Sequence, residues 1–252
     1  MGAEALDGLR LVLFLAAAFG AEVIGTTAGF GAATILTPIA ALFMDIKTAI
    51  VFVACFHLFG NASRLSFFGR RVRWNIWAAF GITGIACSML GAHVTTRLSS
   101  DVVRVAFGAF LLLFVTLSVV PVARFQLPST RATLVGGGIV SGFITGLIGT
   151  GGAVRSACLL AWRLPTEAYL GTSAAIALVV DATRVPVYLA GGLLRPDLVP
   201  VLAALVAVAF AGAWTGQRIV RRLHAETIRR LVLVLLALMG VKLVADGWRG
   251  LV

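Results

Sequence analysis

Two glycine-rich interruptions of apolar sequence are the features of this chain best suited to bind a ligand. The first reads Thr26-Thr27-Ala28-Gly29-Phe30-Gly31-Ala32-Ala33, and the second reads Gly146-Leu147-Ile148-Gly149-Thr150-Gly151-Gly152-Ala153. Gly29 and Gly149 are 120 residues apart. A helix that restarts inside a membrane presents unpaired N–H groups and the positive end of its dipole, and both attract anions. The sequence therefore predicts an anion site where the two interruptions meet.

Small residues at the interruptions are the candidates for direct contact, because a backbone without bulky side chains lets an oxyanion approach its amides. The alternative is that small residues only let membrane helices pack closely. Two interruptions in matching positions favour binding. The predicted contacts are Thr26, Thr27, Gly29, Gly31, Ala32, Gly149, Thr150, Gly151 and Gly152.

A matched pair of arginines follows the interruptions. Arg64 and Arg184 are 120 residues apart, and each is preceded by a polar residue, Asn61 or Asp181, that shares its helix face. A guanidinium can hold an oxyanion through two hydrogen bonds. The alternative is that each arginine reaches the membrane surface or pairs within the protein. Asn61, Arg64 and Arg184 are therefore candidate substrate ligands.

A third arginine, Arg155, lies one turn into the second short helix. It has no counterpart in the first half, where Ile35 stands. If it faces a cavity, it is the strongest single anion ligand on the chain, and otherwise it lies at a helix interface.

Three ionisable groups within apolar segments are candidates for proton coupling or gating, namely Glu22, His57 and Asp181. For Glu22, neutralisation of an arginine is the favoured alternative. His57 is seven residues before Arg64 and so shares its helix face, and the alternative role for it is packing within the helix bundle.

The composition indicates that these residues belong to a membrane protein. Hydrophobic residues make up 60% of the 252 residues, charged residues 12%, and the mean hydropathy is +1.03, whereas soluble domains carry about 25% charged residues. The net charge of +11 comes from arginines in short connections, where membrane topology explains them, so nucleic acid is not a predicted partner. The three cysteines lack metal-ligand spacing, and no metal or cofactor is predicted.

The chain is an internal duplication. Asn61-Ala62-Ser63-Arg64 matches Asp181-Ala182-Thr183-Arg184 at a spacing of 120 residues. The sequence predicts an all-α, polytopic membrane protein of two repeats, 1–120 and 132–252, joined by a linker over 121–131. Repeat 1 has a broken helix over 9–44 and spans over 48–68, 74–94 and 102–120; repeat 2 has a broken helix over 132–164 and spans over 168–189, 198–218 and 228–244.

The length of the broken helix predicts how the repeats run. Residues 9–44 would span about 54 Å as one helix, too long for one crossing of a roughly 30 Å core and short for two. A hairpin of one longer and one shorter helix fits best. With three further spans in each half, the two repeats are inverted, and the bias of basic residues places the Arg70 and Arg221 loops in the cytoplasm.

These motifs resemble those of the TauE/SafE family of sulfite and organosulfonate permeases. The resemblance rests on Gly29-Phe30-Gly31-Ala32-Ala33 followed by Pro38, on Gly149-Thr150-Gly151-Gly152-Ala153, and on the Asn/Asp-x-x-Arg that follows each. It covers almost the whole chain, but Ala32-Ala33 stands where glycines are common and Cys158 where a proline would parallel Pro38. The resemblance implies passage of small sulfur-containing anions, such as sulfite, sulfoacetate or another two-carbon sulfonate, across a bacterial cytoplasmic membrane.

Two other function classes compete with a transporter. The same helix ends would serve an anion channel, and sequence does not separate a channel from alternating access. An intramembrane enzyme is disfavoured, because no Walker lysine follows the glycines and no H-E-x-x-H motif is present. The direction of transport, the particular anion and the oligomeric state are left open by the sequence.

Overall fold

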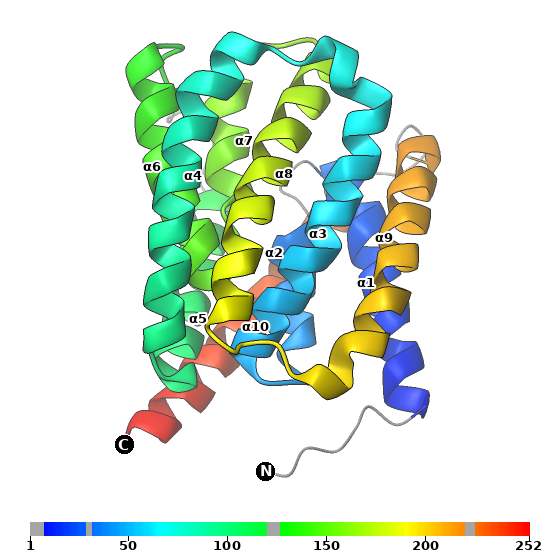
Figure 1. Ribbon diagram of the computed structural model, residues 1–252, viewed down its shortest axis with the longest axis vertical. Helices are drawn as coiled ribbons and strands as arrows, with labels where there is room; N and C mark the ends of the chain where they lie inside the picture. Colours follow the sequence, from blue (N-terminus) through cyan, green and yellow to red (C-terminus); the bar gives the residue numbers. More distant parts are fainter. Residues whose placement is uncertain (1–7, 29–31, 120–126, 220–224) are drawn as a thin grey trace.

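The computed structural model describes residues 8–28, 32–119, 127–219 and 225–252, and these residues form helices with no strand (Figure 1). The prediction of an all-helical protein is confirmed. The helices are α1 (Gly8–Ala28), α2 (Ala32–Ala40), α3 (Ile46–Phe68), η1 (Gly69–Arg71), α4 (Trp74–Arg97), α5 (Ser100–Val119), α6 (Arg131–Ile148), α7 (Gly152–Leu160), α8 (Thr166–Ala190), η3 (Pro196–Leu198), α9 (Val199–Ile219) and α10 (Ala225–Leu251).

Eight helices within the described ranges are long and apolar enough to cross a membrane. Large apolar side chains on their outer surfaces, such as Leu113, Leu117 and Leu238, are more than half exposed. An apolar surface of this extent is stable against lipid rather than water. The chain is a multi-pass membrane protein, as predicted.

Two short helices, α2 and α7, differ from the full spans. Each has nine residues, about 14 Å of helix, or half the thickness of a bilayer core. α2 packs against α1, and α7 packs against α6. Each pair is therefore a hairpin of one longer and one shorter helix.

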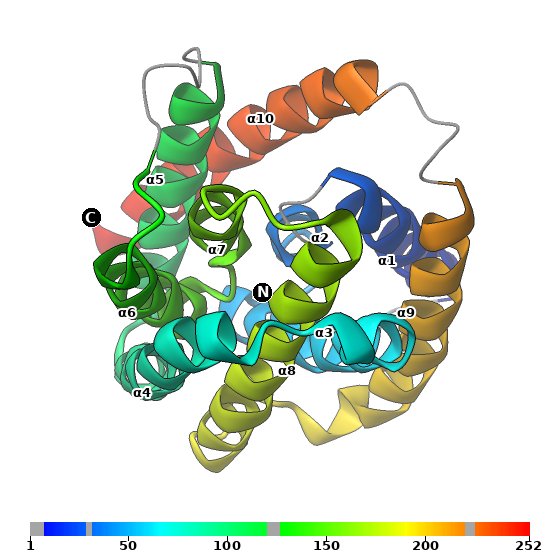
Figure 2. The same cartoon turned by 90° about the horizontal axis from the view of Figure 1, so that it is seen from above.

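The two hairpins enter the molecule from opposite ends. In Figure 1, the start of α1 and the α2–α3 connection are both at the lower end. The start of α6 and the α7–α8 connection are both at the upper end. The end of α10 also lies at the lower end. The packing partners correspond between the halves, because α1 packs against α9 and α6 against α4, while α3 packs against α8 and α5 against α10 (Figure 2).

Local sequence fixes the ends of several helices. The Asp45 carboxylate accepts a hydrogen bond from the Lys47 N–H at the start of α3, and the Thr130 hydroxyl does the same for Thr133 at the start of α6. Gly149 ends α6 in the left-handed conformation, with φ of 83°, which a residue without Cβ adopts at little cost. This turn joins α6 to the start of α7 and so positions it.

The structure differs from the predicted ranges at some ends. α10 continues to Leu251, beyond the predicted end at 244, because Lys242 and Asp246 pair at 2.7 Å one turn apart and support the helix past its apolar part. α6 begins at Arg131, which the sequence assigned to the linker. Part of that linker, residues 121–126, lies outside the described residues, as does residue 120 at the end of the predicted span 102–120.

Glycines let α4 and α6 approach closely. A Cβ on Gly142 would lie 2.3 Å from the Gly84 carbonyl oxygen, and one on Gly146 would lie 2.0 Å from that of Ser88. Neither approach is sterically allowed, so α6 must carry glycine at these positions to keep its contact with α4.

Gly142→Ala is therefore expected to destabilise the protein by about 1–3 kcal/mol, since the added methyl group forces the two helices apart. The measurement is thermal unfolding in detergent. Gly136→Ala, on the same helix with no atom within 4 Å of the added Cβ, is the matched control and should leave stability unchanged or slightly raised. Equal effects of the two substitutions would contradict this account of α4–α6 packing.

Candidate functional site

The start of the short helix α2 lies beside the turn that precedes the short helix α7. The hydroxyl of Thr34, near the start of α2, lies 2.7 Å from the hydroxyl of Thr150, in the turn before α7. Both residues are buried. Two segments 116 residues apart in sequence are thus joined by a direct hydrogen bond.

The start of α7 is built to leave its backbone accessible. Gly151 precedes the helix and provides no side-chain cap, so the first N–H groups of α7 have no acceptor within their own helix. A Cβ on Gly151 would lie 2.1 Å from the Thr145 hydroxyl. The Ser141 hydroxyl donates to the Gly151 carbonyl at 2.8 Å, which fixes the turn so that its amides keep their direction.

Arg155 supplies an uncompensated positive charge beside these amides. Its side chain is buried, with the residue 6% exposed, and it lines the same small cavity as Gly151 and Gly152. Within the described part of the chain, the guanidinium makes one hydrogen bond, from Nε to the Ser173 hydroxyl at 3.1 Å. Its two terminal nitrogens therefore remain for a ligand.

Arg184 has a different environment, because all five of its N–H groups have protein acceptors. Nε and Nη2 approach one carboxylate oxygen of Asp181 at 2.9 and 2.7 Å. Nη1 donates to the Thr145 carbonyl at 2.6 Å and to the Tyr188 hydroxyl at 3.4 Å. Nη2 also donates to the Gly149 carbonyl at 3.4 Å. Arg184 thus binds the carboxyl end of α6, where a cation is favoured, and holds the turn that leads into α7.

His57 joins the first half of the chain to the second. Its Nδ1 lies 2.9 Å from the Asp181 carboxylate and 3.0 Å from the Asn61 side-chain nitrogen. Among the described residues, its Nε2 is buried without a hydrogen-bond partner. An unsatisfied buried ring nitrogen is unfavourable, and His57 is one of the residues that line the cavity.

Glu22 and Arg64 form a second buried ion pair. Glu22 is fully buried and binds the terminal nitrogen Nη2 of Arg64 through one carboxylate oxygen. Arg64 also donates to the Asn61 side-chain oxygen at 3.1 Å. The pair fits between α3 and α9 because Gly60 and Gly212 leave space for the Glu22 side chain. Asn61 therefore links this pair to His57, so one polar network runs from Glu22 to Arg184.

The cavity at the start of α7 is small in this conformation. Its volume is about 10 Å³, roughly that of one water molecule. A polyatomic anion is larger than this, so the cavity would have to widen to hold one. The lining residues are Ala33, His57, Thr145, Gly149, Thr150, Gly151, Gly152, Arg155, Asp181 and Arg184.

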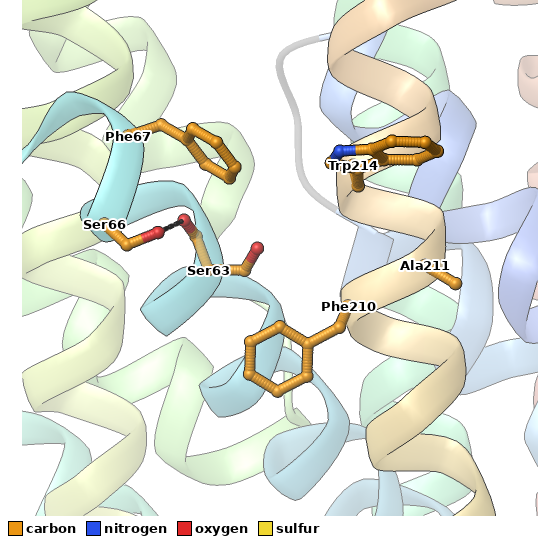
Figure 3. A pocket seen from close by; sticks show the side chains of 6 residues that line it. All are labelled: Ser63, Ser66, Phe67, Phe210, Ala211 and Trp214. Atoms are coloured by element: carbon orange, nitrogen blue, oxygen red, sulfur yellow. Dashed lines mark hydrogen bonds between the residues drawn. The ribbon is translucent and has the colours of Figure 1, made fainter.

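A larger cleft of about 390 Å³ opens between α3 and α9. Figure 3 shows its two walls facing each other, with Ser63, Ser66 and Phe67 from α3 on one side and Phe210, Ala211 and Trp214 from α9 on the other. The Arg218 guanidinium lies 3.6 Å from the centroid of the Trp214 ring. The buried Glu22–Arg64 pair is adjacent, since Gly60 and Gly212 are each within one turn of a cleft residue.

The structure brings most of the predicted site residues together, but not all of them can be placed. Gly149, Thr150, Gly151, Gly152 and Arg155 line one cavity with His57, Asp181 and Arg184. Ala32 is buried in close contact with Gly25. Gly29, Gly31 and the side chains of Thr26 and Thr27 lie outside the described residues.

Several site residues were missed from the sequence. Ser141, Thr145 and Ser173 are ordinary small polar residues in helices, and no spacing distinguishes them. Tyr188 had a signal, because it follows Arg184 by four residues and so shares its helix face. Thr34 has no polar counterpart in the other repeat, where Val154 stands.

Comparison with known proteins gives one match. The family described as Sulfite exporter TauE/SafE matches residues 13–243, nearly the whole chain. No curated protein and no solved structure matches the chain at a significant level.

Proposed function

The chain belongs to the TauE/SafE sulfite exporter family and is a membrane transporter, and we propose that it moves small sulfur-containing anions by alternating access. Sulfite, sulfoacetate and other two-carbon sulfonates are the proposed substrates, and the cytoplasmic membrane of a bacterium is the proposed location. The anion is held by the first amides of α7 and by arginine.

The observation that carries this proposal is the environment of Arg155. A buried guanidinium with two unused nitrogens lies beside a helix start that has no cap. An isolated buried charge is unfavourable by several kcal/mol, and an oxyanion bound there accepts hydrogen bonds from both the guanidinium and the amides. Arg184 and Arg64 would stabilise the protein around the site rather than bind the anion, since their described contacts are to protein groups.

Inverted repeats would provide the alternating access. The hairpins enter from opposite ends of the molecule (Figure 1). In the two repeats α3 corresponds to α8 and α4 corresponds to α9, so the pair of α3 and α9 is equivalent to the pair of α8 and α4. A cleft separates α3 from α9, whereas Gly84 of α4 lies close to Val180 of α8. Transport would alternate between two states. In the present state the cleft between α3 and α9 is open and α4 lies close to α8, and in the other state α4 and α8 would separate while the cleft closes.

The ionisable groups have a proposed role in this exchange. Glu22 binds Arg64 between the cleft helices, and Asp181 binds His57 across the two halves. Protonation of Glu22, His57 or Asp181 would weaken or strengthen these contacts and so couple protons to the movement. By the arginine bias, the upper end in Figure 1, which carries Arg70 and Arg71 on η1, would face the cytoplasm.

Flux in proteoliposomes tests the proposal. Radiolabelled sulfite or sulfoacetate should enter with saturation kinetics, and unlabelled anion inside the liposomes should accelerate it. Liposomes containing Arg155→Met protein serve as the control and should show the background rate. Conductance without saturation would favour an anion channel instead, and no flux of any small sulfur oxyanion would contradict the proposal.

A further inference from the structure

The buried charges of the site do not balance. Among the described residues, three arginines are buried, Arg64, Arg155 and Arg184, against two carboxylates, Glu22 and Asp181. Each carboxylate pairs with one arginine. One positive charge therefore has no counter-charge, and it lies on Arg155 at the cavity.

This imbalance determines which anions the site can hold. One monovalent anion, such as a sulfonate with no other charge, compensates Arg155 fully. A divalent anion, such as sulfite or thiosulfate, leaves one excess negative charge in a region shielded from water, where an uncompensated charge is costly. A divalent anion thus needs one more positive charge in the cavity.

His57 is placed to supply that charge by taking up a proton. It lines the cavity, its Nε2 has no hydrogen-bond partner among the described residues, and the Asp181 carboxylate lies 2.9 Å from its Nδ1, where it would accept a hydrogen bond from a protonated ring. Glu22 also has an unpartnered oxygen, but it lies against Gly60 and Gly212 and does not line the cavity.

The other ionisable groups around His57 already have fixed roles. α2 has no ionisable residue, and the one on α9, Arg218, lies near the end of that helix against Trp214. The buried ionisable groups on the remaining described elements are Asp181, Arg184 and Tyr188 on α8, Arg155 and Cys158 on α7, Glu22 on α1, and Cys55 and Arg64 on α3 itself.

We propose that the site binds monovalent sulfonates without a proton and binds divalent sulfur oxyanions together with one proton on His57. The inference rests on the proposed function. It adds a rule that relates the charge of the anion to the uptake of a proton, and it names the proton as the coupling ion. Divalent substrates would then be transported with a proton, and monovalent ones without.

Calorimetric titration of the purified protein tests this rule. The probes are methanesulfonate, which stays monovalent, and thiosulfate, which stays divalent, between about pH 6 and pH 8, a range that spans the ordinary pKa of histidine. Thiosulfate affinity should fall by up to about tenfold per pH unit above the histidine pKa, and methanesulfonate affinity should stay constant. Repeating the titration in buffers of different ionisation enthalpy should show uptake of about one proton with thiosulfate and none with methanesulfonate.

Two variants locate the proton. His57→Gln should abolish the pH dependence for thiosulfate, whereas His93→Gln, at an exposed position of α4 away from the cavity, is the matched control and should keep it. The inference is overturned if thiosulfate binds wild-type protein without proton uptake, or if His57→Gln retains the pH dependence. Those outcomes leave the proposed function intact, whereas failure of both anions to bind wild-type protein contradicts the function and the inference together.

Discussion

Arg155→Met should weaken binding of small sulfur oxyanions by roughly 30-fold to 1,000-fold, or about 2–4 kcal/mol, because it removes the charged partner of a buried ion pair. It should not unfold the protein. The guanidinium has one described hydrogen bond, to Ser173, so replacing it by an apolar chain of similar length removes an unfavourable buried charge. The ligand-free protein should melt at the wild-type temperature or above it.

Calorimetry and thermal unfolding of the same preparation check both parts of this prediction. Arg131→Met, at the exposed start of α6, is the matched control and should bind anions as wild type does. Wild-type affinity in Arg155→Met would remove this residue from the site, and a large loss of stability would show that it has a structural partner.

Arg184→Met should have the opposite profile, with a loss of stability of about 3–5 kcal/mol. The substitution leaves the buried Asp181 carboxylate without its main partner and frees the carbonyls of Thr145 and Gly149. Since these groups hold the turn before α7, anion binding should be lost as well. Thermal unfolding in detergent measures the first effect, and anion-dependent stabilisation measures the second.

A double-mutant cycle separates the stability contributed by the Arg184–Asp181 ion pair from that contributed by the other contacts of Arg184. Arg184→Met with Asp181→Asn should recover part of the stability, because the unpaired carboxylate is then neutral. Additive effects of the two substitutions would show that the pair is not coupled, and wild-type stability of Arg184→Met alone would contradict its structural role.

The contrast between Arg155 and Arg184 shows which contacts could not be predicted from the sequence. Spacing predicts that Arg184 shares a helix face with Asp181, and the two residues do pair. Spacing says nothing of the contact between Arg184 and the end of α6, which joins positions 39 residues apart. The repeat therefore made Arg64 and Arg184 the prominent candidates, whereas the geometry favours Arg155, which the repeat does not duplicate.

The fold was more predictable than the site. Apolar runs, glycine breaks and the length of 9–44 predict helices, their approximate ends and a hairpin, because each depends on local sequence. Contacts between distant segments have no such signal. The Thr34–Thr150 and His57–Asp181 hydrogen bonds join residues 116 and 124 positions apart, and they depend on how the hairpins meet.

A structure determined with bound sulfite tests the central claim most directly. The account predicts an oxyanion within hydrogen-bonding distance of the terminal nitrogens of Arg155 and of the first amides of α7, in a cavity enlarged from the present volume of about 10 Å³. An anion bound elsewhere, for example in the cleft between α3 and α9, with Arg155 turned to a protein acceptor, would contradict it.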